Sequence, residues 1–221
     1  GTCLHDMFER VDFTRSQGWP QVVVEALQRH GFDAQWQDAA LAMLHSAIQA
    51  ELAPGVHLAD IPPSRRRVEM EFTLPANGLN LAAMQAVLCQ PAHGLAAPLR
   101  EAAGTLSFER VQGYLKGFID LVFIADDALW LVDYKSNHLG DSYADYGTAQ
   151  LAASIAREHY YLQYLIYCVA LRRYIAQRAP QLRLGGVRYL YLRGIDGKGQ
   201  GVWHDAPDDA LLAALDALFV P

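Results

Sequence analysis

The chain of 221 residues is poor in cysteine, and this absence excludes two classes of small stabilised domain. Its three cysteines, Cys3, Cys89 and Cys168, lie far apart and form no Cys-x-x-Cys pair. We therefore expect neither a disulfide framework nor a Cys₄ zinc or iron–sulfur site. Sparse, unpaired thiols suit a reducing compartment, and we expect a cytoplasmic protein.

Long apolar runs and nucleotide-binding loops are also lacking. No stretch approaches the roughly 18 apolar residues of a membrane span, and no secretory signal is visible, so we expect no membrane partner. There is no Gly-x-Gly-x-x-Gly and no Gly-x-x-x-x-Gly-Lys-Ser/Thr loop, which argues against a cofactor enzyme or an ATP-driven motor. The chain opens at Gly1-Thr2-Cys3 without an initiator Met, which indicates a piece of a longer protein.

Excess positive charge is absent as well, since the formal net charge is −6. That is the wrong sign for a protein that grips DNA alone, because phosphate contacts need Lys and Arg. Either the basic groups gather in one place or a partner supplies the grip. The densest basic run, Arg65-Arg66-Arg67, either contacts phosphate or forms a solvated loop.

The length predicts one domain with a sizeable core, and apolar periodicity assigns its elements. Helical spacing appears at 3–13, 20–30, 37–52, 79–89, 143–158, 160–178 and 207–219. Period-two or β-branched patterns predict strands at 67–74, 114–124, 128–134 and 186–193. Residues 54–63, 91–104 and 194–201 are interpreted as loops. This order predicts an α/β fold with a mixed central sheet and helices on its faces.

One hairpin brings three charged residues together. If Asp126 and Asp127 are its turn, paired positions sum to 253, so Asp120 lies opposite Asp133. Opposed Cβ atoms in an antiparallel pair are about 5 Å apart. Lys135 shares the face of Asp133, because side chains alternate along a strand. A longer turn would shift this register.

Two carboxylates at this spacing suit Mg²⁺, which usually takes one or two carboxylates and keeps several waters. Such a metal polarises a phosphoryl oxygen and lowers the pKa of bound water, and Lys135 would orient that water or neutralise developing charge. The alternative is a surface salt-bridge cluster. The apolar sequence around Asp120 and Asp133 argues against it, because bare carboxylates in such strands are costly.

These residues also carry a family resemblance. Gly117-Phe118-Ile119-Asp120 and Leu131-Val132-Asp133-Tyr134-Lys135-Ser136-Asn137 resemble the PD-(D/E)XK nuclease motif. The specific version is similar to the C-terminal nuclease domain of the RecB family, the β subunit of the RecBCD helicase–nuclease (exodeoxyribonuclease V). Further matching segments are Gly1-Thr2, Leu4-His5, Met70-Glu71-Phe72, Leu74-Pro75, Leu162-Gln163-Tyr164, Tyr167, Gly185-Gly186-Val187, Tyr189-Leu190 and Leu192-Arg193-Gly194. A lone Asp-x-Lys would be weak, whereas this ordered set is specific.

The resemblance implies a restriction-endonuclease-like core with an N-terminal helical portion, forming one nuclease domain over residues 1–221. It implies that Mg²⁺ is held by His5, Asp120, Asp133 and the backbone carbonyl of Tyr134, with Lys135 assisting the attacking water. From the residues alone, His5 would be an ordinary exposed partner of Glu9 at i,i+4. With the resemblance His5 becomes a metal ligand, and Glu9 a weak candidate.

Two further positions follow from the resemblance. The family has an acidic residue on the strand that carries Glu69 and Glu71, and either of them binds metal or lies on a solvated edge. The family's Gln-x-x-x-Tyr element places Gln163 and Tyr167 on one helical face, toward the DNA backbone or the active-site lysine. The alternative is that the tyrosines of this helix are core residues, which we prefer for Tyr164. Arg188 and Arg193 lie on a predicted strand, and one of them is expected to face the DNA.

The implied activity is hydrolysis of DNA phosphodiester bonds on strands delivered by an attached helicase. The implied partners are DNA, RecC-like and RecD-like subunits and RecA, in double-strand break repair and recombination. The rival interpretation is a catalytically silent docking or DNA-binding module, because folds can keep a scaffold while losing its chemistry. A single-stranded DNA-binding domain would need an excess of positive charge, which the chain lacks.

Overall fold

A central sheet of five strands organises the computed structural model, which describes residues 1–77, 79–107 and 113–220. The strands are β3 (Arg66–Pro75), β4 (Tyr114–Ala125), β5 (Ala128–Lys135), β6 (Arg183–Tyr191) and β7 (Val202–Asp205), in that order across the sheet. Neighbours pair antiparallel except β5 and β6, which are parallel. The predicted mixed sheet is therefore confirmed.

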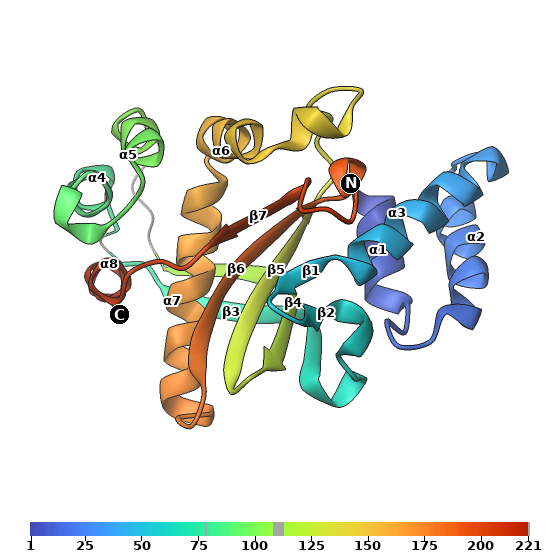
Figure 1. Ribbon diagram of the computed structural model, residues 1–221. Helices are drawn as coiled ribbons and strands as arrows, with labels where there is room; N and C mark the ends of the chain where they lie inside the picture. Colours follow the sequence, from blue (N-terminus) through green and yellow to red (C-terminus); the bar gives the residue numbers. More distant parts are fainter. Residues whose placement is uncertain (78, 108–112, 221) are drawn as a thin grey trace.

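Helices cover both faces of this sheet (Figure 1). One lobe contains α1 (Thr2–Arg10), α2 (Trp19–Arg29) and α3 (Gln37–Gln49), followed by the small hairpin of β1 (Glu51–Ala53) and β2 (Val56–His57). The remaining helices are α4 (Leu81–Leu88), α5 (Ala97–Gly104), α6 (Thr148–Arg157), α7 (Tyr160–Arg178) and α8 (Asp209–Asp216). Short 3₁₀ turns span Ser16–Gly18, Ala34–Trp36, Leu58–Asp60, Pro63–Arg65, Pro91–His93, Tyr143–Tyr146 and Leu192–Gly194. No helix among the described residues has the length and apolar character to cross a membrane.

Two apolar cores follow from this layering. The larger packs α4–α8 against one face of the sheet, and the second packs α1–α3 against the other. Strand β5 separates them residue by residue, since Leu131 lies in the first core while Val132 and Tyr134 lie in the second. This alternation places Asp133 and Lys135 on the α7 side, and the ring of Tyr134 on the α1 side.

The β4–β5 hairpin has the predicted turn. Asp126 and Asp127 have positive φ angles of 49° and 56°, as a two-residue type I′ turn requires, and Asp tolerates that conformation better than most residues. The described pairs run from Ala125–Ala128 to Leu121–Val132, all summing to 253. The predicted register is thus confirmed up to the pair Leu121–Val132, which is one position before Asp120 and Asp133.

Strands β3 and β4 are both distorted at one point. Glu69 has a φ of 48°, and the pairs Val68–Leu121 and Met70–Ile119 flank it without a described pair between Glu69 and Asp120. The packing changes sides at the same place, because Ile119 lies in the larger core and Leu121 in the second. In regular alternation they would share one face. Asp120 therefore lies outside the described backbone pairs of β4 with β3 and β5.

Several predicted bounds were wrong. The helix expected over 37–52 ends at Gln49, because the backbone of Ala50 is extended and the chain enters β1. The helix expected over 143–158 is interrupted at Gly147, which caps α6 with an extended backbone. The strand expected over 186–193 runs from Arg183 to Tyr191, since parallel pairing with β5 extends it at its start.

Four helices and strands were missed, namely α5, β7 and the two short strands β1 and β2, which fall in an expected helix end and an expected loop. Residues 91–104, expected as a loop, contain α5, in which Pro98 occupies the first turn and Leu99 and Ala103 bury one helical face. Proline is tolerated there because the first amide groups of a helix have no partner within it. The glycine-rich turn after β6 leads into β7, whose pairing with β6 had no clear alternating pattern to reveal it.

Candidate active site

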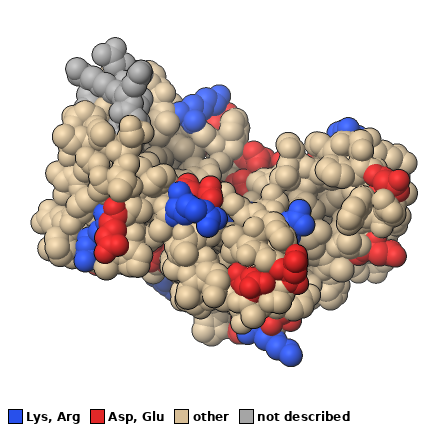
Figure 2. All heavy atoms as spheres, turned by 90° about the horizontal axis from the view of Figure 1, so that it is seen from above, with Lys and Arg blue, Asp and Glu red and all other residues tan. Residues whose placement is uncertain are grey.

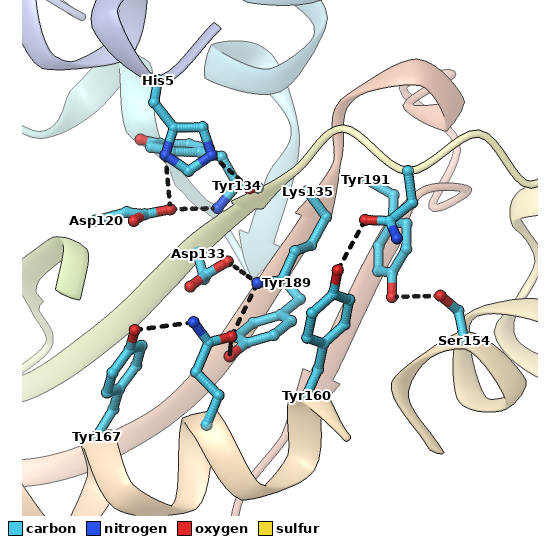
Figure 3. Close-up of polar contacts among 12 residues, drawn as sticks. His5, Asp120, Asp133, Tyr134, Lys135, Ser154, Tyr160, Tyr167, Tyr189 and Tyr191 are labelled. Atoms are coloured by element: carbon cyan, nitrogen blue, oxygen red, sulfur yellow. Dashed lines mark hydrogen bonds and ion pairs between the residues drawn. The ribbon is translucent and has the colours of Figure 1, made fainter. Parts of the chain in front are cut away.

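The predicted charged residues meet where β4 and β5 leave their ladder, between α1 and α7 (Figure 3). Asp120 comes from β4, Asp133 and Lys135 from β5, His5 from α1, and Gln163 and Tyr167 from α7. Helix α1 is held there by its apolar face, because the ring of Phe8 stacks on that of Tyr134 with 4.1 Å between ring centroids. This packing places His5 beside the backbone of Tyr134.

The Asp120 carboxylate joins β4 to β5 and to α1. Its Oδ2 accepts a hydrogen bond of 2.8 Å from the backbone N–H of Tyr134, and lies 3.5 Å from Nδ1 of His5. Burial raises the pKa of Asp120 to about 8, and the neighbouring Asp133 charge adds to this rise. The bond from Tyr134 and the charge of Lys135 oppose it only in part. Asp120 is thus a carboxylate kept in an environment that disfavours its charge.

Asp133 and Lys135 form a buried ion pair. Their side chains are only 3% and 9% exposed, and Lys135 Nζ lies 2.5 Å from Asp133 Oδ1. Burial raises the pKa of Asp133, and the Lys135 charge works in the opposite direction. Such a pair is retained only when other contacts satisfy both groups, because the cost of desolvation is comparable to the attraction.

Lys135 makes those other contacts on the α7 side. Its Nζ donates to Gln163 Oε1 at 2.8 Å and lies over the rings of Tyr160 and Tyr189, at 3.9 and 4.6 Å from their centroids. Cations are attracted to aromatic faces, more strongly where water is excluded. An ion pair, an amide and two rings therefore fix the position of the ammonium group (Figure 3).

Gln163 is itself held in one orientation. The hydroxyl of Tyr189 donates to its Oε1 at 2.8 Å, and its Nε2 donates to the hydroxyl of Tyr167 at 2.9 Å. Gln163 thus contacts Lys135, as the family resemblance implied, and Tyr167 contacts Gln163 on the helical face that their spacing predicted. Tyr164 is a core residue as preferred, fully buried with its hydroxyl donating to Asp205 at 2.5 Å.

Sequence reasoning missed Tyr160 and Tyr189. Tyr160 was grouped with the core tyrosines, yet it is half-buried and lies over Lys135. Its position three residues before Gln163 on a helix was the available signal. Tyr189 is the direct partner of Asp133 in the parallel β5–β6 ladder, and its placement needed a register that the sequence does not give.

His5 contacts the same end of β5. Its Nε2 donates to the carbonyl oxygen of Tyr134 at 2.9 Å, since a carbonyl can only accept. The imidazole, the Asp120 carboxylate and the Tyr134 carbonyl therefore converge. As metal ligands, these oxygen atoms and the imidazole nitrogen form a set suited to a hard or borderline divalent cation.

The two acidic candidates on β3 are separated by the structure. Glu71 forms an exposed ion pair with Lys116, 3.0 Å from Oε1 to Nζ. Glu69 lies opposite Asp120 at the strand distortion. Burial raises the pKa of Glu69, and the charge of Glu9 adds to the rise. Glu69 is thus the acidic residue that adjoins the site, with Glu9 close enough to influence it.

The donor chemistry fits a divalent metal, although the side chains are not arranged as a finished cage. Within residues 1–77, 79–107 and 113–220, no three His, Cys, Asp or Glu side chains are grouped as a metal site. Asp133 is directed at Lys135 and His5 at the Tyr134 carbonyl, so each donor has a protein partner. A cation would compete with these contacts, and its positive charge would compensate the charges of the buried carboxylates.

The two arginines expected on the last predicted strand differ in position. Arg188 donates to the carbonyl of Leu52 and lies over the ring of Trp130, at 4.7 Å from its centroid, away from the carboxylates. Arg193 donates from Nε to the carbonyl of Ser136 at 3.0 Å, directly after Lys135 in the chain. Arg193 is therefore the one beside the site.

Basic side chains do not gather over the face seen from above (Figure 2). Lys and Arg are scattered there in ones and twos, and the surface is hollowed between the lobe of α1–α3 and the part that carries α4 and α5. Acidic side chains show in the hollow. This face offers no broad positive field that would hold a nucleic acid by charge alone.

Comparison with known proteins shows the family of the chain. The family model described as the PD-(D/E)XK nuclease superfamily matches residues 1–218. The chain is 37% identical over 226 residues to the RecBCD enzyme subunit RecB of Escherichia coli strain K12, covering 99% of this chain and 19% of that protein. It is 35% identical over 228 residues to RecB of Haemophilus influenzae, covering 99% and 18%.

RecB of Mycolicibacterium smegmatis is 32% identical over 232 residues, covering 92% of this chain and 21% of that protein. The chain thus spans about a fifth of the length of these relatives. The resemblance to the RecB family, which rested on Asp120, Asp133 and Lys135 with the matching segments around them, is confirmed along nearly the whole chain.

Proposed function

Since this chain belongs to the PD-(D/E)XK nuclease superfamily, we propose that it hydrolyses DNA phosphodiester bonds, with Mg²⁺ as its metal. The observation that carries the proposal is the meeting of Asp120, Asp133 and Lys135 at the open end of the β4–β5 hairpin. Nucleases of this superfamily depend on divalent metals, and the donors at this site suit one. The inactive docking module is the alternative that the assay below must exclude.

His5, Asp120, Asp133 and the Tyr134 carbonyl would hold the metal, with Glu69 adjoining them. The metal, when bound, would polarise the phosphoryl oxygen and lower the pKa of a water. Lys135, released from part of its contact with Asp133, would orient the attacking water and neutralise negative charge on the phosphate. Gln163 and Tyr167 would keep the lysine in place.

The wider assignment rests on the relatives, which are RecB subunits of RecBCD enzymes. We propose that this chain is the nuclease part of a longer subunit, working on DNA with RecC-like and RecD-like partners in break repair and recombination. Its acidic net charge of −6 agrees with a domain that depends on other parts for much of its DNA grip. Loading of RecA and a cytoplasmic location stay predictions.

Metal removal is the direct test. The chain, incubated with linear single-stranded DNA and Mg²⁺, should cleave it, and EDTA should abolish cleavage because the donor set would be empty. Asp133→Asn should be as inactive as the chelated wild type, since it removes a charged donor. Gel analysis of end-labelled DNA measures the loss, and circular dichroism shows whether the variant is folded.

Cleavage that persists in EDTA would contradict metal dependence. A folded wild type that leaves DNA intact is to be assayed again within the full RecBCD-type complex, beside the same complex carrying Asp133→Asn. Equal cleavage by both complexes would identify the domain as a docking module.

The Gln163 network gives a second prediction. Gln163→Ala removes the amide that joins Lys135 to Tyr167 and Tyr189. A displaced ammonium group should lower kcat by roughly 10²-fold and leave KM nearly unchanged, because positioning errors of about 1 Å have effects of that size. Gln28→Ala, at an exposed position of α2, serves as the control. A change in KM alone would place Gln163 in DNA binding instead.

A further inference from the structure

A groove of about 740 Å³ adjoins the site, between the first half of β3 and the C-terminal end of α7. Its walls include Arg65, Arg67, Glu69 and Tyr174, and its floor includes Val122 and Leu129. We call it the arginine groove. Nothing in the proposed chemistry uses its arginines or its tyrosine.

One end of the groove adjoins the proposed catalytic residues through Glu69. Glu69, one of its lining residues, lies opposite Asp120 between the pairs Val68–Leu121 and Met70–Ile119. On the other wall, Tyr174 follows Tyr167 by seven residues, so the two lie on one face of α7, two turns apart. Tyr167 contacts Gln163 at the site. The groove therefore begins beside the carboxylates and follows α7 away from them.

The charges of two of its arginines are free of ion pairs. Among the described residues, ion pairs engage Arg10, Arg29, Arg66, Lys116, Lys135, Arg157, Arg172 and Arg173, and not Arg15, Arg100, Arg183, Arg188, Arg193 or Lys198. Arg65 and Arg67 are exposed, and neither has an ion-pair partner among the described residues. Arg66 between them is instead half-buried, over the ring of Phe13 at 3.9 Å.

A third unpaired cation lies on the rim. Arg178 is exposed at the end of α7, again without an ion-pair partner in the described part of the chain. It lines a neighbouring hollow that shares Tyr174, Met70 and Glu71 with the arginine groove. Glu71 is neutralised by Lys116. Positive charge thus borders the groove, although the whole chain is acidic.

The floor distinguishes single strands from duplexes. Met70, Ile124 and Leu182 give the groove half-buried apolar side chains, and Tyr174 is 40% exposed. A duplex presents its phosphates outward and its base faces only to one another, so it gains little from apolar and aromatic walls. An unpaired strand exposes base faces that stack on aromatic rings, while its phosphates contact arginines.

We propose that the arginine groove binds single-stranded DNA, with Arg65 and Arg67 on phosphates and Tyr174 against a base, and aligns the strand at the Asp120–Asp133–Lys135 site. This inference rests on the proposed function for its ligand, DNA, and adds where and in what form the DNA is held. It is also compatible with the acidic net charge, because three cations without ion pairs among the described residues, Arg65, Arg67 and Arg178, border the path of the strand.

Binding can be tested apart from cleavage. A fluorescent oligodeoxythymidine is titrated with the 221-residue chain in EDTA, over a series of salt concentrations, with anisotropy as the readout. Arg65→Ala/Arg67→Ala should weaken binding about 10-fold or more at low salt. The slope of log K against log [salt] should become shallower by about 1.4, because each neutralised phosphate of a single strand accounts for roughly 0.7 of that slope.

Matched variants separate a local effect from a general change in charge. Arg172→Ala/Lys198→Ala also removes two positive charges, but these residues line neither the groove nor the site, and it should change binding less than 2-fold or so. Arg65→Lys/Arg67→Lys should restore most of the salt slope. Tyr174→Ala should weaken binding roughly 10-fold, whereas Tyr143→Ala, at another exposed tyrosine, should not.

The outcomes separate this inference from the proposed function. Loss of affinity in the groove variants, together with equal cleavage by the full complex with and without Asp133→Asn, would support the groove and contradict the nuclease. Wild-type affinity and salt slope in Arg65→Ala/Arg67→Ala would overturn the groove even if cleavage is confirmed. A blunt duplex that binds as tightly and is weakened equally by these variants would overturn the assignment to single strands.

Discussion

Replacing Lys135 with alanine is expected to lower DNA cleavage by about 10³-fold and to leave single-stranded DNA binding within a few-fold of wild type. The ammonium group lies 2.5 Å from Asp133 and contacts no other carboxylate among the described residues. It is therefore the group able to neutralise charge that develops on the phosphate. Cleavage is measured as single-turnover kinetics with excess protein, and binding as anisotropy in EDTA.

The same substitution should destabilise the metal-free fold by about 3–5 kcal/mol, because Asp133, 3% exposed, would keep a buried charge without a partner. Adding Asp133→Asn should restore stability but not cleavage. Lys116→Ala is the matched control, since its ion pair with Glu71 is more than half exposed on both sides and such pairs contribute about 0–1 kcal/mol. Cleavage within 10-fold of wild type by Lys135→Ala would exclude the proposed role of the lysine.

The hairpin that carries Lys135 could be predicted because its information is local. Two adjacent Asp residues between apolar strands specify a two-residue turn with positive φ angles, and the turn fixes every pair up to Leu121–Val132. Helical spacing likewise placed Gln163 and Tyr167 together. These inferences need only chain geometry over a few residues.

The residues around Lys135 that were missed depend on long-range packing. Tyr189 meets the lysine because β6 pairs parallel with β5, and a parallel register is set by a whole crossover rather than by a turn. The choice of Glu69 over Glu71 depends on a positive φ at Glu69. That conformation is uncommon for Glu, and no local pattern in the sequence predicts it.

Charge distribution is another property that composition conceals. The net charge of −6 argued against DNA binding without a partner. The structure shows in addition which of the described cations have an ion-pair partner and which have none. Arg66 in the basic run is held by neighbouring backbone and aromatic groups, while Arg65 and Arg67 remain free of ion pairs within the described residues. The sequence placed all three in one class, because pairing is a tertiary property.

Asp120→Asn is expected to make the metal-free protein more stable than wild type at pH 8.5, while abolishing cleavage. Burial first, and then the charge of Asp133, raises the pKa of Asp120 from 3.8 to about 8. Between these values the unfolded chain releases a proton that the folded chain still holds. The contribution of Asp120 to the stability of the wild type should therefore be present in full below pH 4, fall as the pH rises, and level off above pH 8.

The size of this effect follows from the same shift. About four pH units of differential protonation correspond to no more than about 6 kcal/mol, and coupling to Asp133 makes a few kcal/mol the expected value. Asparagine removes the titration, and its side-chain oxygen can still accept the hydrogen bond from the Tyr134 amide. Urea unfolding in EDTA at pH 5 and pH 8.5 measures the difference. Asp141→Asn, at a fully exposed side chain, should change stability by less than about 0.5 kcal/mol.

A divalent metal should reverse the order of stability. Wild type would gain stability with increasing Mg²⁺ as the cation binds the folded state alone, whereas Asp120→Asn, lacking a charged donor, would gain little. The carboxylates would then be groups that weaken the fold in order to bind metal, a common relation between stability and function. If Asp120→Asn is instead less stable than wild type at pH 8.5 without metal, the Asp120 charge supports the fold, and its contact with His5 is structural.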